Sequence, residues 1–154
     1  MKKFELTGET KLWFGRTLHR IRALVAFGDV DVGELGGWIE NESNLDQSGN
    51  AWVYGNALVS GNALVYGDAL VSGNARVYER RAIMWISVIG SRNDTVTFFA
   101  CKGGIIGVTV GCFHGSIDEF AEKVRKTHGD NEHAQAYMIA IELAKLRVKV
   151  EVPA

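Results

Sequence analysis

The sequence has little of several residues that usually define the class of a protein. A single proline, Pro153, stands near the end of the 154-residue chain, and there are only two cysteines, Cys101 and Cys112. Two cysteines are too few for a disulfide scaffold, and no Cys/His set has the spacing of a zinc site. We therefore expect no metal ion and no other cofactor, and we interpret both thiols as buried core residues.

Long apolar runs are also missing. No stretch approaches the about 18 consecutive apolar residues that a transmembrane helix needs, and no cleavable leader is visible at the start. With 47% apolar residues, the chain can nevertheless bury a real core. We expect a soluble, cytoplasmic protein without membrane contacts.

Positive charge is absent from the middle of the chain. Residues 25–75 contain seven Asp and Glu but no Lys or Arg, whereas residues 1–24 contain six basic residues and two acidic ones. The net charge is −1. This distribution lacks the basic footprint of a nucleic-acid binder, so we expect no direct binding of DNA or RNA.

What the chain does have is a repeat of six residues. Glycine recurs at positions 49, 55, 61, 67 and 73, with Ala two places later and Val two places after that. Residues two apart in a strand point to the same face, so the Ala and Val side chains share an interior. Each Gly-Asn or Gly-Asp pair suits a corner with positive φ. Such repeats wrap the chain into a coil of short strands, and the register slips between Leu45 and Gly49.

The residues between Ala and Val point outward, and four of them are large and apolar. Five repeats make fewer than two turns, so the coil has two open ends and buries little by itself. We expect the outward side chains to be covered by the rest of the chain or by another copy. This expected oligomer or packing surface consists of Trp52, Leu58, Leu64 and Leu70.

The tandem pattern Val-x-Gly-(Asn/Asp)-Ala-x resembles the hexapeptide-repeat, left-handed β-helix proteins, in which three hexapeptides close one triangular turn. That resemblance implies a short left-handed β-helix and a homotrimer about a parallel axis. The stretches Gly15–Leu24 and Leu35–Glu40 resemble the beginning of small phage and prophage proteins that carry this repeat. The second resemblance implies a viral origin and a bacterial host cell, but no established activity.

The fold class that we predict is mainly β with a C-terminal α+β part. Residues 1–38 form N-terminal strands and a cap, in which Trp38 covers the open end of the coil. Residues 39–79 form the β-helix. Residues 80–154 form a three-stranded meander followed by two helices, because Ser116 with Glu119 makes a capping box and Asn131 can cap a second helix.

A basic stripe precedes the repeat. One interpretation pairs these cations with the acidic coil, and a second is an anion site, because converging guanidinium groups bind phosphate well. Tyrosines outside the coil can stack on a planar base. The candidate ligand-binding residues are Arg16, His19, Arg20, Arg22, Trp38 and Tyr54.

Catalysis is harder to place. Many acyltransferases share this coil and use a histidine as general base, but residues 20–113 contain no histidine. One candidate pair is His114 and Cys112, which alternation places on one face without an identifiable third orienting group. We assign no catalytic residue.

The leading hypothesis is a non-enzymatic, oligomeric binding protein of a phage or prophage. It would counter host defence by sequestering either a host defence protein or an anionic nucleotide signal. Two alternatives stay open: an acyltransferase-like enzyme that uses His114 and Cys112, and a structural component of the virion.

Overall fold

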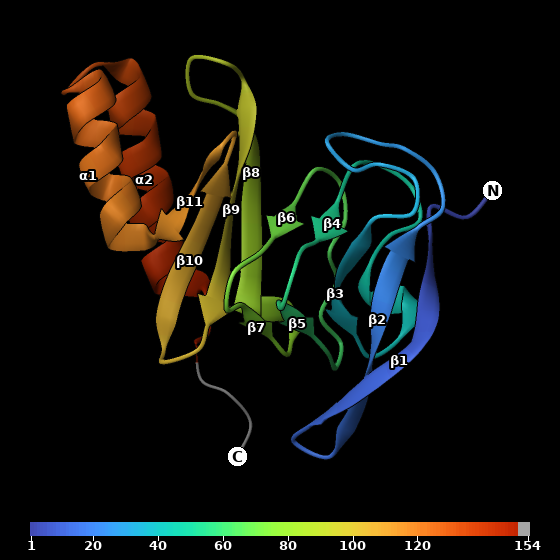
Figure 1. The fold of residues 1–154 in the computed structure, drawn as a ribbon. Coiled ribbons are helices and arrows are strands. Elements are labelled where there is room, and N and C mark those ends of the chain that lie inside the picture. Colours follow the sequence, from blue (N-terminus) through green and yellow to red (C-terminus); the bar gives the residue numbers. More distant parts are fainter. Residues whose placement is uncertain (151–154) are drawn as a thin grey trace.

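The computed structural model describes residues 1–150 as a mainly β molecule with two C-terminal helices (Figure 1). The N-terminal hairpin is made of β1 (Phe4–Trp13) and β2 (Arg16–Ala23). The middle of the chain contains β3 (Leu35–Ile39), η1 (Glu42–Asn44), β4 (Trp52–Val53), β5 (Leu58–Val59), β6 (Leu70–Val71), β7 (Arg76–Val77) and η2 (Arg80–Ala82). The last part contains β8 (Ile83–Ile89), β9 (Asp94–Cys101), β10 (Ile105–Val110), β11 (Phe113–Ser116), α1 (Ile117–His128) and α2 (Glu132–Arg147).

The short strands of the repeat stack in parallel. β4 pairs with β6, which places Trp52 opposite Leu70, and β5 pairs with β7 in the same way. In both pairs, the partner strand lies three hexapeptides further along the chain. Where the pairing crosses the register slip, the partners are further apart in sequence, as in the bridge between Leu45 and Val65. The extra positions lie between Leu45 and Gly49, where the sequence predicts the slip.

The interior of this coil is built from alanine and valine as predicted. The five alanines and five valines of the repeat are all buried. The five glycines of the repeat have φ between 56° and 73°, which an L side chain adopts only under strain. The alternation of small and branched residues thus specifies which face of each strand is inside.

The N-terminal hairpin continues one face of the coil. β2 pairs antiparallel with β3, and β3 pairs parallel with β5, which gives the strand order β1-β2-β3-β5-β7. The prediction that Trp38 covers the open end of the coil is wrong. Trp38 lies opposite Leu58 on the lateral face and packs in a small cluster with Leu58 and Leu18, because the antiparallel pairing of β2 fixes β3 as one more strand of that face.

The C-terminal part contains one strand more than the predicted meander. Its antiparallel sheet has the order β11-β10-β9-β8, because Phe113–Ser116 pairs with the end of β10 before the first helix begins. Ser116 and Glu119 form the predicted capping box of α1, and Asn131 accepts a hydrogen bond from the Ala134 amide at the start of α2. Within residues 1–150, no helix combines the length and the apolar character needed to cross a lipid bilayer.

The C-terminal sheet closes one open end of the coil. The Leu70 amide donates to Thr97 Oγ1 at 3.2 Å, and Thr109 Oγ1 donates to the Leu70 carbonyl at 2.8 Å. Beside them, Ala75 forms an antiparallel bridge with Cys101. Backbone groups of the last turn are therefore satisfied by the same chain.

The outward apolar side chains of the coil are covered mostly within the same chain. Trp52 is fully buried, with the rings of Phe27 and Phe4 at 5.2 and 6.3 Å. Leu58 is buried beside Trp38, whereas Leu64 and Leu70 are partly exposed. Trp52 and Leu58 are thus packing residues inside one molecule and are not available to a second copy.

Candidate functional site

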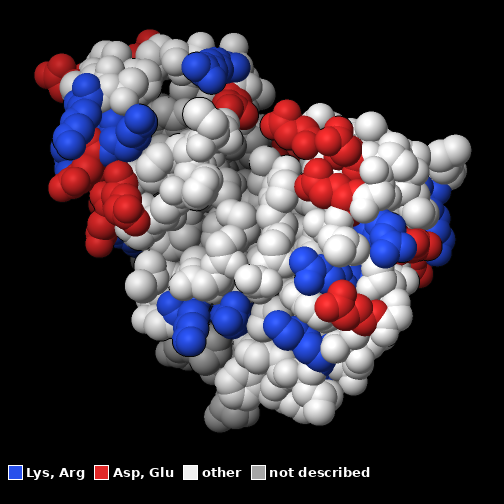
Figure 2. Space-filling view, viewed as in Figure 1, with Lys and Arg blue, Asp and Glu red and all other residues white. Residues whose placement is uncertain are grey.

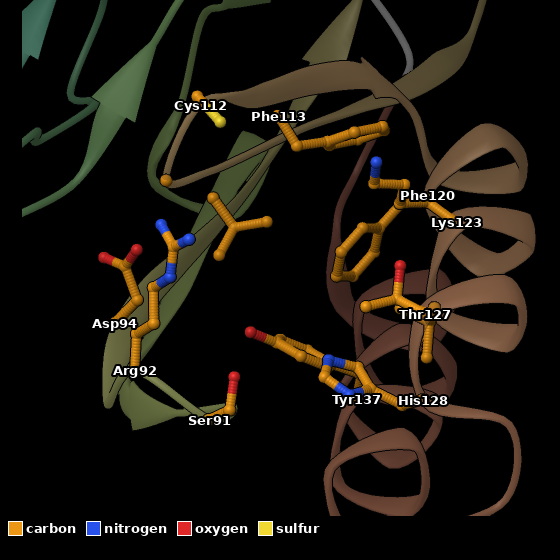
Figure 3. Close-up of a pocket in the computed structure, with 13 residues that line it drawn as sticks. Ser91, Arg92, Asp94, Cys112, Phe113, Phe120, Lys123, Thr127, His128 and Tyr137 are labelled. Carbon is orange, nitrogen blue, oxygen red and sulfur yellow. The ribbon is translucent and has the colours of Figure 1, made fainter.

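A cavity of about 320 Å³ opens at one end of the C-terminal sheet (Figure 3). Its walls come from three places: the turn between β8 and β9, the turn between β10 and β11, and the faces of α1 and α2 that look toward the sheet. The side chains that line it span from Ser91 to Tyr137 in sequence. Only the folded module brings them together.

Glycine allows the first of these turns to approach α2. Gly90 has a φ of 80°, and a β-carbon at this position would collide with the Tyr137 hydroxyl group. The ring of Tyr137 is therefore held directly against the turn, with its hydroxyl oxygen directed into the cavity in Figure 3. Gly111, with a φ of 54°, forms the second turn.

Aromatic rings make the floor of the cavity. The Phe120 ring lies 5.4 Å from Phe113 and 5.2 Å from Tyr137, measured between ring centroids. The His128 ring stacks on Tyr137 at 6.2 Å. Phe120 is held in place because it is on the buried face of α1, between the sheet and α2. Phe120 and Tyr137 are almost fully buried, so Phe113 is the aromatic ring of this group that is partly exposed at the cavity, and the buried rings hold it in place.

The rim of the cavity carries more positive than negative charge. Arg92 and Lys123 line it together with one carboxylate, Asp94. Among residues 1–150, neither Arg92 nor Lys123 has a carboxylate within 4.0 Å. Burial, together with the nearby charge of Asp94, raises the pKa of Tyr137 above its ordinary value, so its hydroxyl group keeps its proton and can donate a hydrogen bond.

In contrast to Arg92 and Lys123, the arginines of the basic stripe that was predicted as an anion site do have carboxylate partners. Each of its three arginines has a carboxylate partner: Arg16 with Glu40 at 2.8 Å, Arg20 with Glu9 at 4.0 Å and Arg22 with Glu5 at 3.6 Å. Only Glu40 belongs to the coil, and the other two partners lie on the neighbouring strand β1. The structure thus pairs all three cations within the chain, but only Arg16 pairs with the coil as the first interpretation expected.

Of the other predicted ligand-binding residues, Trp38 and His19 lie beside the arginines on the paired strands β3 and β2, whereas Tyr54 lies elsewhere. Trp38 is buried on the lateral face, where Lys11 Nζ and the Arg20 guanidinium lie 4.7 and 5.4 Å from its ring. His19 is on β2 opposite Ile39. Tyr54 instead lines a second cavity, of about 390 Å³, between the coil and the C-terminal sheet.

Cys112 and His114 line that second cavity too. Cys112 is exposed in the turn between β10 and β11, in contrast to our interpretation of it as a core thiol, whereas Cys101 is buried. His114 is on β11 and is exposed. The prediction that Cys112 and His114 share one face assumed that both belong to one strand. Cys112 lies in the turn, so the alternation of the strand does not include it.

No family model matches this chain. One known protein shares a stretch of it. Over 37 residues, the chain is 49% identical to a protein of Escherichia coli K12 described as the uncharacterized acetyltransferase YdcK. The stretch covers 24% of this chain and 11% of the other protein. This likeness hints at the hexapeptide-repeat family and does not extend over the rest of the chain.

The sequence alone missed the cavity of the C-terminal module. Arg92 lies in a segment with the pattern of an ordinary hairpin turn, and Lys123 lies on the polar side of an amphipathic helix. Figure 2 shows charged side chains gathered on both sides of the molecule around a largely uncharged hollow, with acidic ones over the upper part of the coil side. Local patterns do not indicate which charges meet when their residues belong to separate elements.

Proposed function

We propose that this chain is a binding protein that holds an anionic small molecule with a planar ring, of the nucleotide class, in the cavity between α1 and the two sheet turns. One observation carries this proposal. Arg92 and Lys123 are cations without carboxylate partners in residues 1–150, and they face a cavity with an aromatic floor. Such a site complements a phosphate joined to a base.

Each group in the cavity has a role in this proposal. Arg92 offers a planar fork of donors that matches a phosphate, and Lys123 adds a second positive charge. The ring of the ligand packs on the partly exposed Phe113, which the buried Phe120 supports from behind, and the Tyr137 hydroxyl donates to an acceptor on the ring or sugar. The cavity volume of about 320 Å³ lies at the lower end of the usual range of about 300–1,000 Å³, which favours a small ligand.

The coil serves as the rigid support of this module. We infer that it is a short left-handed β-helix of the hexapeptide-repeat family. The pairing of strands three hexapeptides apart, the buried alanines and valines and the positive φ of the glycines support this inference. The partial likeness to an acetyltransferase also supports it.

In this proposal the protein binds its ligand stoichiometrically and releases it unchanged. That behaviour suits the sequestration of a nucleotide signal of host defence. The resemblance of the N-terminal stretch supports only the phage or prophage origin in this proposal. Capture of a host defence protein is the competing form of the same hypothesis. The cavity favours the nucleotide, because its size and its charge suit a small anion better than a protein surface.

The test measures nucleotide binding by calorimetry with adenosine 5′-monophosphate, using adenosine and inorganic phosphate as partial probes. The expected order of affinity is the nucleotide above either part. Arg92→Ala and Lys123→Ala each weaken nucleotide binding at least ten-fold, whereas Arg20→Ala and Lys126→Ala leave it unchanged. Equal binding of adenosine and the nucleotide, or loss of binding in the Arg20 variant, contradicts the proposal.

The same preparation distinguishes the competing functions. Small-molecule mass spectrometry of the heat-released ligand should return it chemically unchanged. A co-purifying host protein that binds the Arg92→Ala variant equally well would instead support capture of a protein.

An acyl-transfer activity is a second candidate function. Two observations favour it: the partial likeness to an acetyltransferase, and the presence of Cys112 and His114 in one cavity. If the protein is such an enzyme, His114→Ala abolishes acyl transfer from an acyl thioester while the variant keeps its fold. Turnover that survives His114→Ala excludes this site.

A further inference from the structure

Helix α2 is apolar on two opposite sides. One side is in the core of the module through Ala134, Tyr137, Ile141 and Ala144. On the other side, the side chains of Ile139, Leu143 and Leu146 are 70%, 43% and 76% exposed. A surface helix normally has one apolar stripe and a polar outer face, so the outer stripe of α2 needs a separate explanation.

The neighbouring helix α1 has no such exposed apolar stripe. All exposed positions of α1 carry polar or charged side chains, among them Asp118, Glu122, Arg125 and Lys126. Both helices cover the same face of the sheet in Figure 1 and meet the same solvent. Three large aliphatic residues in one line on α2 therefore indicate a surface that is covered in use.

The spacing of the stripe is that of a helix-pairing seam. Ala136, Ile139, Leu143 and Leu146 follow one another at alternating intervals of three and four positions. This is the alternation of a and d positions with which two helices pack side by side, knobs into holes. We name these four residues the α2 seam; its first member, Ala136, is partly buried against the core of the module, and the other three are exposed.

Charges beside the seam select both the partner and its direction. Glu142 directly precedes Leu143, and Arg147 directly follows Leu146, so the two lie on opposite flanks of the seam in g and e positions. Neither forms an ion pair within residues 1–150. In a parallel pair of identical helices, Glu142 faces the partner's Arg147 on both flanks. In an antiparallel pair, Glu142 faces its own copy, and the like charges repel.

We propose that the α2 seam is a self-association surface, on which a second copy of this chain docks its own α2 in parallel about a two-fold axis. The seam is self-complementary, as such an axis requires. This proposal is independent of the ligand cavity. It also differs from the predicted trimer built on the outward residues of the coil, because Trp52 and Leu58 are already covered inside one molecule.

The strength of this dimer follows from the length of the seam. The seam runs from Ala136 to Leu146 and so spans roughly 15 Å at about 1.5 Å per residue, which gives an interface below about 1,200 Å². The helix is already folded and held by the module, so association costs no helix formation. We expect a dissociation constant on the order of micromolar.

The first test is the mass of the full chain by sedimentation velocity over a wide concentration series. The wild type should shift from monomer to dimer as concentration rises. Leu143→Glu should stay monomeric throughout, because it puts a charge into the seam. Lys145→Glu, which lies outside the seam on the same helix, is the matched control and should associate like the wild type.

The second test checks the parallel direction by exchanging charges. Glu142→Arg and Arg147→Glu should each weaken association about ten-fold, since each places like charges on both flanks. The double variant should recover the wild-type dissociation constant. Circular dichroism of every variant confirms the helix content, so that loss of association is not loss of folding.

Three results would overturn the proposal. A wild-type chain that stays monomeric at all concentrations shows that the seam is not used in this way. An assembly that survives Leu143→Glu uses another surface. A double charge variant that fails to recover association refutes the parallel pairing.

Discussion

The ammonium group of Lys3 donates a hydrogen bond of 2.8 Å to the carbonyl oxygen of Ala51, at the N-terminal end of the coil. The same Nζ lies 3.4 Å from the carbonyls of Ser48 and Gly49. Lys3 is almost fully buried, and this burial lowers the pKa of its amine below the ordinary value. One buried cation therefore hydrogen-bonds a backbone carbonyl at the N-terminal end of the coil. Thr97 and Thr109 form the corresponding hydrogen bonds to the backbone of Leu70 at the other end.

Lys3→Met should destabilise the protein by about 1–3 kcal/mol, because it leaves the buried Ala51 carbonyl oxygen without this donor. The measurement is the free energy of unfolding in urea. Lys2→Met is the matched control, since Lys2 makes an exposed ion pair with Glu42 and such pairs contribute about 0–1 kcal/mol. Equal effects of the two variants would show that Lys3 does not cap the coil.

Gly36→Ala should destabilise the junction between hairpin and coil by about 1–3 kcal/mol through overpacking. A β-carbon there would lie 2.7 Å from Ile21, Trp52 and the Val53 carbonyl oxygen. Gly8→Ala is the matched control, because nothing lies within 4 Å of a β-carbon at that strand position. The thermal midpoints of the two variants should separate clearly, with Gly8→Ala at or above the wild type. A Gly36→Ala variant as stable as wild type would contradict this packing.

Glu40→Ala should cost more stability than Arg16→Ala. Glu40 Oε1 accepts from Arg16 and also from the Gly61 amide, each at 2.8 Å. Removing Arg16 loses one exposed ion pair, whereas removing Glu40 also leaves a partly buried corner amide unpaired, which costs about 1–3 kcal/mol. Urea titrations of the two variants measure the difference in their free energies of unfolding. Equal losses would show that the hydrogen bond from the Gly61 amide to Glu40 does not contribute to stability.

The two thiols should react differently. Burial raises the pKa of the Cys101 thiol to about 11, whereas Cys112 is exposed. At pH 8 a thiol reagent should modify one cysteine in the folded protein and both in denaturant. The Cys112→Ser variant should show no modification until it unfolds. Rapid labelling of that folded variant would place Cys101 at the surface.

The same raised pKa has a consequence for stability. The folded chain binds the Cys101 proton more tightly than the unfolded chain does, so this contribution is fully present below the ordinary pKa of 9.0. It is lost as the pH rises through about 11. The free energy of unfolding should therefore decline over this interval, and less steeply in a Cys101→Ala variant when each chain is compared with its own value at pH 8.

The sequence by itself determined the repeat and its interior. Alternation of alanine and valine at a period of two sets the buried face, and a glycine every sixth residue sets the corners, because both depend on local backbone geometry. The caps of α1 and α2 were predictable for the same reason, since Ser116, Glu119 and Asn131 bond to amides close by in the chain. The slip after Leu45 was also visible as a change of period.

Only the tertiary structure decided what covers the coil and where charges meet. The repeat pattern places Trp52 on the outside of the coil, and only the folded chain shows that Phe4 and Phe27 cover it. The sequence likewise predicts that Trp38 covers the end of the coil, whereas the pairing of β2 with β3 places it on the lateral face. Arg92 and Lys123 come to one cavity, whereas the arginines of β2 are each paired with a carboxylate. Contacts between residues far apart in the chain depend on how whole elements pack, and no local period encodes that packing.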